Sequence, residues 1–200
     1  VFSVSNVVVQ SQINSFGADA VAGSSAALNF EYYCYFIIQA FNGAAISFIA
    51  QNYGAGLMQR VRRVFWICMI ASVIFCGMMN GIFACFSPFF LRIFSSSEAI
   101  IPYGVTRMHL VLAFQWVACS YEISASALRG MGRSLLPALL TVVGTCLLRM
   151  VWVFAVCPLW PGFHRLMLVY PLSWVLTGAM VVAAYVRFMK KAGGAPLAVR

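Results

Sequence analysis

The stretch that decides the fold class is FIAQNYGAGLMQRVRRVF, residues 48–65. An apolar run ends at Gln51 and Asn52, two glycines follow, and three arginines fall within four residues before the chain becomes apolar again. Glycines punctuate turns, and arginines beside apolar runs usually mark the cytoplasmic side of a membrane protein. The stretch therefore indicates the end of one membrane-spanning helix, a tight turn and the start of the next.

The composition agrees with a membrane protein. The chain has 200 residues, of which 63% are hydrophobic and 8% are charged, whereas soluble domains carry about 25% charged residues. Its mean hydropathy is +0.92. The net charge of +9 does not indicate nucleic-acid binding, because no basic stripe alternates with aromatic residues as a binding channel requires. We therefore expect an all-α integral membrane protein.

The apolar runs predict six membrane-spanning helices, each of about 20 residues. They lie at about residues 1–15, 25–51, 61–90, 102–128, 135–157 and 166–188. The chain opens inside an apolar run without a Met, so we expect its first helix to be truncated and the chain to be a piece of a longer protein. Residues 1–188 form the predicted membrane domain, and residues 189–200 form a basic cytoplasmic tail.

The charged residues are distributed asymmetrically between the two sets of alternating connections. One set holds nine basic residues: Arg60, Arg62, Arg63, Arg129, Arg133, Arg187, Lys190, Lys191 and Arg200. The other set holds Asp19, Arg92, Glu98, His164 and Arg165, with Arg107 close by. Because basic residues are retained in cytoplasmic loops, both termini are predicted to be cytoplasmic.

Three of the predicted spans carry polar side chains on one helical face. These side chains are Asn6, Gln10 and Asn14; Glu31, Tyr35, Gln39 and Asn42; and Gln115, Cys119, Glu122 and Ser126. They predict the lining of one aqueous pocket, although amides can also act as hydrogen-bonding contacts between helices. Glu31 and Glu122 are the candidate coupling acids, because a carboxylate inside a span must be paired, hydrated or protonated.

Arg149 is the one basic residue well inside a predicted span. Arg149 and Glu31 lie at similar depths in the membrane when residues are counted from the predicted outer ends of their spans. At about 1.5 Å per residue, Glu122 lies about 15 Å away from them along the membrane normal, near the cytoplasmic end. We therefore expect Arg149 to pair with Glu31, the alternative being a guanidinium capped by carbonyl groups. Aromatic residues that could form a cation-binding wall, or instead contact lipid or the core, are Tyr32, Tyr35, Phe36, Phe41, Phe114 and Trp116.

Enzymatic chemistry has little support in the sequence. There are two histidines, and no Ser-His-Asp arrangement, zinc-protease motif or phosphate-binding loop is present. The seven cysteines include no CxxC pair and are interpreted as small buried hydrophobes rather than a disulfide framework or a metal site. We expect no cofactor, so any transport must be driven by an ion gradient.

Several stretches, taken in order, resemble the multidrug and toxic compound extrusion (MATE) family, and within it the bacterial branch related to the DNA-damage-inducible efflux proteins. They are SFGADAVAGSSAALNFE (15–31), AISFIAQNYGAG (45–56), RVRRV (60–64), ALRGMGRSLLP (127–137), LLRMVWVF (147–154) and YPLSW (170–174). The resemblance covers nearly the whole chain. It implies a twelve-helix transporter of two six-helix lobes, of which this chain resembles the second.

The resemblance also implies a function and a partner. Family members export cationic, amphipathic drugs across the bacterial cytoplasmic membrane in exchange for H⁺ or Na⁺, and the N-terminal lobe of the same polypeptide would form the other half of the cavity. Glu122 approximately matches the family's acid in span ten, and Glu31 resembles an acid of the bacterial branch. The acid that many members carry in span seven has no counterpart in residues 1–15, which leaves the choice of coupling ion open.

Two alternatives remain at the level of the sequence. A flippase for lipid-linked precursors, from the same superfamily, would favour basic cavity residues such as Arg107 and Arg149. A non-transporting membrane subunit would need neither Glu31 nor Glu122 for export. The sign of the charge in the cavity separates the first alternative from drug export.

Overall fold

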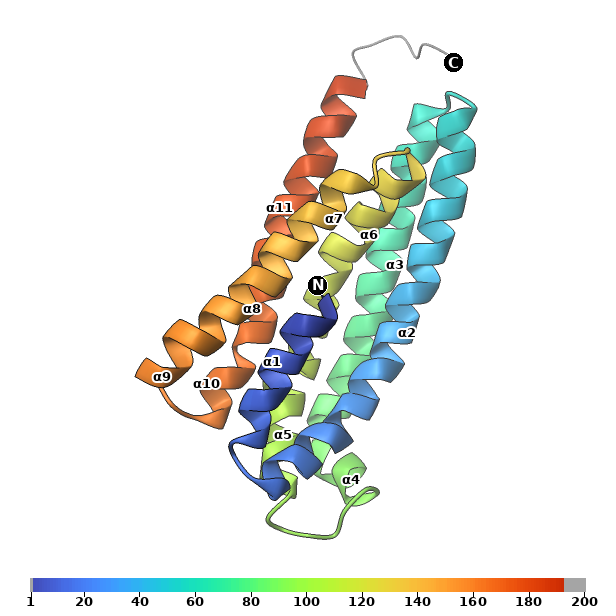
Figure 1. Cartoon of the computed structure of the whole chain (residues 1–200). Coiled ribbons are helices and arrows are strands. Elements are labelled where there is room, and N and C mark those ends of the chain that lie inside the picture. Colours follow the sequence, from blue (N-terminus) through green and yellow to red (C-terminus); the bar gives the residue numbers. More distant parts are fainter. Residues whose placement is uncertain (1, 193–200) are drawn as a thin grey trace.

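The computed structural model describes residues 2–192, with side chains described for residues 5–191. Within that part of the chain every regular element is a helix. Figure 1 shows the helices lying side by side in one elongated bundle, with the chain reversing direction at each turn. The tail expected at 189–200 begins inside the last helix, which continues to Ala192. Residues 193–200 lie outside the described residues.

Six helical rods follow one another along the described chain. The first three are α1 (Phe2–Asn14), α2 (Ala18–Gly54), and α3 (Met58–Cys85) followed by α4 (Ser87–Arg92). The fourth consists of α5 (Ile101–Leu110), the 3₁₀ segment η1 (Leu112–Val117) and α6 (Ala118–Gly130). The fifth consists of α7 (Leu135–Thr141), η2 (Val142–Leu147), α8 (Leu148–Val151), η3 (Trp152–Val156) and α9 (Cys157–Leu159). The sixth consists of α10 (Phe163–Met167) and α11 (Val169–Ala192).

Four of these rods are long and apolar enough to cross a membrane: Ala18–Gly54, Met58–Cys85, Leu135–Leu159 and Phe163–Lys191. The described part of α1 has 13 residues, and η1 interrupts the fourth rod, so neither contains one helix of sufficient length. One face of α3 exposes Trp66, Ile70, Ile74, Met78 and Ile82. Such an apolar outer face suits lipid rather than water, and we describe the chain as a multi-pass membrane protein.

Two turns of similar sequence join rods at one end of the bundle. Gly56 in the α2–α3 turn has φ 74°, and Gly132 in the α6–α7 turn has φ 77°. In each turn the residue after this glycine donates its N–H to the carbonyl five residues earlier, at 2.9 and 2.8 Å. This is a Schellman motif, which places a glycine at the left-handed position and satisfies free carbonyls at a helix end. The Asn52 amide adds a bond to the carbonyl of Phe48 at 2.8 Å, so it stabilises the end of α2.

The basic residues gather at the end of the bundle that holds these two turns. Figure 1 places the α2–α3 turn, the α6–α7 turn and the C-terminal end of α11 at one end, and the other connections at the opposite end. We call the first the arginine-rich end; its described basic residues are Arg60, Arg62, Arg63, Arg129, Arg133, Arg187, Lys190 and Lys191. The asymmetry expected from the sequence is therefore present in three dimensions.

The fifth rod is irregular where it packs against α11. Segments η2 and η3 are π-helical, a local widening that often marks functional positions in helices. Gly144 lies in η2 against α11, and the neighbouring Thr145 hydroxyl is 3.1 Å from that of Thr177. The two helices thus approach closely and are linked by hydroxyl groups.

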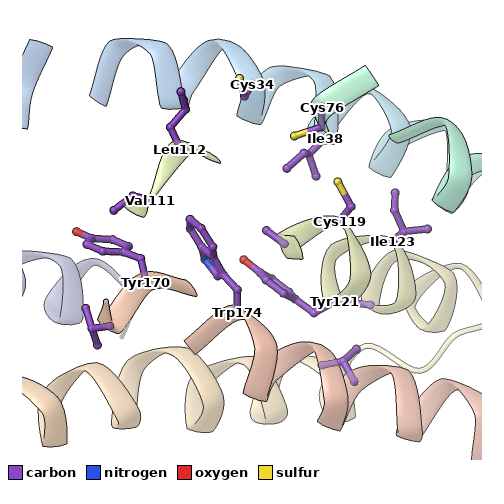
Figure 2. Packing of buried hydrophobic residues seen from close by; sticks show 14 of the residues in the cluster. Cys34, Ile38, Cys76, Val111, Leu112, Cys119, Tyr121, Ile123, Tyr170 and Trp174 are labelled. Atoms are coloured by element: carbon purple, nitrogen blue, oxygen red, sulfur yellow. The ribbon is translucent and has the colours of Figure 1, made fainter. Parts of the chain in front are cut away.

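The core lies where α2, α3, α6 and α11 meet. Figure 2 shows Tyr121 of α6 with Tyr170 and Trp174 of α11, and Cys76 of α3 with Cys119 of α6, among the buried apolar side chains. All seven cysteines are free, and all but Cys85 are buried, which agrees with their interpretation as small buried hydrophobes. Among the described residues no cluster of three potential metal ligands is found.

Candidate functional site

A close contact between α2 and α5 positions the first buried polar cluster. A Cβ atom added at Gly23 would lie 2.5 Å from the carbonyl oxygen of Ile100 and 2.8 Å from the amide nitrogen of Gly104. Only glycine allows the two backbones to approach this closely. The contact brings Ser24, which follows Gly23, within reach of Arg107 one turn after Gly104.

Arg107 and Glu31 form a buried two-point ion pair. Arg107 Nε donates to Glu31 Oε1 at 2.5 Å and a terminal nitrogen donates to Oε2 at 2.9 Å, and the two side chains are 4% and 10% exposed. A third guanidinium nitrogen donates to the Ser24 hydroxyl at 2.7 Å, and the Gln115 amide donates to the backbone carbonyl of Glu31 at 3.0 Å. We call Ser24, Glu31, Arg107 and Gln115 the ion-pair cluster. Its carboxylate is fully engaged, which is the arrangement that makes a buried charge tolerable.

Tyr170 connects the ion-pair cluster to Arg149. The guanidinium carbons of Arg107 and Arg149 lie 5.3 and 4.6 Å from the centre of the Tyr170 ring, within the range of cation–π attraction. Arg149 donates to Asn6 Oδ1 at 2.8 Å and to the Ser173 hydroxyl at 3.4 Å. Two arginines and one carboxylate therefore meet at this level of the bundle, which makes it electropositive.

The expected pairing of Arg149 with Glu31 is wrong, because Glu31 pairs with Arg107. Residue counting misplaced Glu31, since α2 begins at Ala18 rather than near residue 25. It also treated Arg107 as a residue of the outer edge, whereas its side chain is buried.

The second polar cluster surrounds Glu122, whose carboxylate has a different partner and a more open environment than that of Glu31. The Asn42 amide donates to Glu122 Oε2 at 2.8 Å, and in the part of the chain that the structure describes no Lys, Arg or His forms an ion pair with this carboxylate. Glu122 is partly buried and lines a cavity of about 200 Å³ with Tyr121, Ala125, Arg129, Ser134, Pro137, Ala138, Thr141 and Val142. We call this cavity the Glu122 pocket.

The expected single pocket is thus two separate clusters. Glu31 and Asn42 are eleven residues apart on α2, which at about 1.5 Å per residue is about 16 Å. One cluster is closed by an ion pair, and the other is a pocket near the arginine-rich end.

Comparison with known families identifies the type of protein. The family model described as MatE matches residues 1–154, more than three quarters of the chain. The chain belongs to the MatE family. Members of this family are membrane transporters, which agrees with the helical bundle and its apolar outer surface. No curated protein sequence matches the chain significantly.

The MatE match contains most of the candidate site. Glu31, Arg107, Glu122 and Arg149 all lie within residues 1–154, whereas Tyr170 and Ser173 lie beyond them.

The predicted polar stripe of α1 does not converge on one site. Asn6 accepts a hydrogen bond from Arg149, while the Gln10 amide donates to Asn14 Oδ1 at 3.1 Å on an exposed face. Coupling or substrate roles for these residues remain predictions.

The other predicted pocket residues lie on α2 and the fourth rod of this MatE chain. Asn42 and Gln115 are buried at the two clusters, whereas Tyr35 and Gln39 are exposed. Of the predicted aromatic wall, Phe41 stacks with Phe75 at a centroid distance of 6.1 Å. The remaining wall candidates are exposed: Tyr32, Tyr35, Phe36, Phe114 and Trp116.

Sequence reasoning missed Arg107, Ser24, Tyr170 and Ser173 as members of the buried network. For Arg107 a signal was available, because it lies inside an apolar run one turn after Gly104 and a buried cation needs a carboxylate partner. For Tyr170 and Ser173 no such signal exists, since hydroxyl-bearing residues are common in membrane helices.

Proposed function

We propose that the chain is one lobe of a secondary active exporter of cationic, amphipathic compounds, driven by H⁺ or Na⁺, and that Glu122 is its coupling carboxylate. In this proposal all six rods cross the bacterial cytoplasmic membrane, the arginine-rich end and the C-terminus face the cytoplasm, and an N-terminal lobe of the same polypeptide completes the cavity. The assignment to the DNA-damage-inducible branch rests on the sequence resemblance alone.

The observation that carries the proposal is the environment of Glu122. Its carboxylate borders a cavity and is held by an amide rather than by a cation, so a proton, a Na⁺ ion or a cationic substrate can compete for it. Asn42 Oδ1 is buried and has no hydrogen-bond partner within the described chain. Carboxylate and amide oxygens are ligands suited to hard cations, and the amide can present either end to the site.

The chemistry of exchange follows from charge. An ionised Glu122 attracts a cationic compound from the cytoplasmic side, and binding of H⁺ or Na⁺ from the outer side then neutralises the carboxylate and weakens that attraction. A ligand shifts the equilibrium between inward- and outward-facing states only through such a difference in affinity. No cofactor takes part in this cycle.

The structure supports neither the lipid-precursor flippase nor the non-transporting subunit as an alternative function. The flippase alternative relied on Arg107 and Arg149 as phosphate ligands, but Arg107 is engaged with Glu31 and Ser24, and Arg149 with Asn6 and Ser173. The non-transporting subunit is disfavoured by membership of a transporter family.

The proposal is tested by ethidium efflux from energised proteoliposomes that contain the two-lobed transporter. We expect Glu122→Gln to reduce efflux to the level of empty liposomes, while Glu98→Gln keeps wild-type efflux. Glu98 is the matched control because it is an exposed acid paired with Arg92 at the opposite end of the bundle. Full efflux by correctly inserted Glu122→Gln would exclude Glu122 as the coupling acid.

A further inference from the structure

A large apolar groove lies between α7 and α11 at the arginine-rich end. Its volume is about 1300 Å³, more than the roughly 300–1,000 Å³ of pockets for drug-sized ligands. Its walls are mainly aliphatic and include Leu135, Leu136 and Leu139 of α7 and Met180, Ala183 and Ala184 of α11. The three leucines are 48–71% exposed, so the groove is open along α7.

Four cations border this groove, and none of its described lining residues is an acid. They are Arg133, Arg187, Lys190 and Lys191. Arg133 lies in the α6–α7 turn, and its guanidinium carbon lies 5.7 Å from the centre of the Phe188 ring on α11. This contact fixes a positive charge across the groove from the basic end of α11.

A second apolar groove of about 630 Å³ lies along α11 and shares two of these four cations, Arg187 and Lys190. It is lined by Val117, Val175, Val182 and Val186 among others, and it shares Ala179, Ala183, Arg187 and Lys190 with the first groove. Two apolar channels therefore meet at one cationic site on α11. This geometry matches an amphiphile with two hydrocarbon chains and one negatively charged headgroup.

We propose that the arginine-rich end of α11 binds an anionic phospholipid. Its phosphate contacts Arg187 and Lys190, with Arg133 and Lys191 beside them, and its acyl chains lie in the two grooves. Basic pockets between membrane helices favour anionic headgroups, and the aliphatic walls exclude a free phosphate ion as the natural occupant. The bound lipid would link α7 to α11 next to the Glu122 pocket, which shares Ser134 with the first groove.

Native mass spectrometry of the detergent-purified protein tests this assignment. The protein is titrated with phosphatidylglycerol and with phosphatidylcholine of the same acyl chains. We expect the phosphatidylglycerol adducts to form at least about tenfold more tightly, because several cations contribute at the headgroup. We also expect millimolar inorganic phosphate to leave the adducts intact.

Two variants locate the site. Arg187→Gln/Lys190→Gln/Lys191→Gln should remove the preference for phosphatidylglycerol, whereas Arg60→Gln/Arg62→Gln/Arg63→Gln should keep it, because it removes the same charge from the same end outside the grooves. Ala183 lines both grooves, so Ala183→Trp places a bulky side chain where they meet without changing the charge. It should weaken the adducts at least about tenfold, because it obstructs the binding of both acyl chains.

Several results would overturn the proposal. Equal loss in the two triple variants would indicate diffuse surface charge, and unchanged adducts in Ala183→Trp would exclude the grooves. Displacement by inorganic phosphate would indicate a simple anion site. A dimer signal that disappears with Ala183→Trp would assign the grooves to a second copy of the chain.

Discussion

Glu31 and Glu122 are both acids inside apolar runs, yet the structure treats them in opposite ways. Glu31 meets Arg107 through both of its carboxylate oxygens, Gln115 donates to its backbone carbonyl, and Arg107 in turn donates to Ser24. Glu122 meets one amide and borders a cavity. Under the proposed function, this difference in partner is what makes Glu31 a structural carboxylate and leaves Glu122 available for exchange.

The largest expected effect concerns the closed cluster. Glu31→Gln leaves the Arg107 charge buried without its counter-ion, which costs about 3–5 kcal/mol in the free energy of unfolding. Thermal unfolding in detergent measures this loss. The double variant Glu31→Gln/Arg107→Gln should lose clearly less than the two single losses combined. A loss below about 1 kcal/mol for Glu31→Gln, as for an exposed pair, would mean that the ion pair is not structural.

The next effect tests how the ion pair is positioned. Gly23→Ala places a methyl group against the backbone of residues 100–104, and such overpacking costs about 1–3 kcal/mol. Gly43 is the matched control, because it lies in the same helix with nothing within 4 Å of an added Cβ. Gly43→Ala should stabilise the helix by about 0.5–1 kcal/mol. Equal shifts in melting temperature for Gly23→Ala and Gly43→Ala would show that the close α2–α5 contact does not contribute to stability.

A smaller effect is expected for stability at the other acid. Glu122→Gln keeps an oxygen that can accept the Asn42 bond, and the nearby Arg129 is exposed to solvent, so no buried charge loses its counter-ion. The free energy of unfolding should therefore change by less than about 1 kcal/mol. Thermal unfolding in detergent measures this change in stability, and Glu31→Gln is measured under the same conditions for comparison. Similar losses for the two variants would erase the contrast between the clusters.

The smallest effect is expected on the exposed face of α1. Asn14→Ala removes the bond from Gln10, which is worth about 0.2–0.5 kcal/mol for a pair four residues apart on a helix. Efflux and melting temperature should both stay near wild type. A large loss of efflux with normal stability would instead assign α1 to the transport site.

The sequence predicted an all-helical membrane protein and the charge asymmetry, because these depend on local features, and four of the six predicted spans are confirmed as helices long and apolar enough to cross a membrane. Apolar length, glycine turns and loop arginines can be read without knowing which helices touch. The G-x-G turns ending in Gly56 and Gly132 are of this kind.

The partner of Glu31 could not be predicted, because pairing depends on rotation and contact between helices. The Gly23–Gly104 contact brings α5 to α2, and the 3₁₀ segment η1 and the π-helical segments η2 and η3 change helix phase. Counting residues along the sequence assumes regular α-helices and does not show which side chains of different helices face each other. The single predicted pocket became two clusters for the same reason.

The most direct test of the account is labelling with dicyclohexylcarbodiimide, which modifies protonated carboxyl groups in apolar surroundings, followed by peptide mapping of the membrane-embedded transporter. The account predicts labelling at Glu122 that ethidium reduces, and no labelling at Glu31 unless Arg107→Gln removes its partner. Labelling of Glu31 in the wild type, with Glu122 unmodified, would contradict the assignment of the two acids.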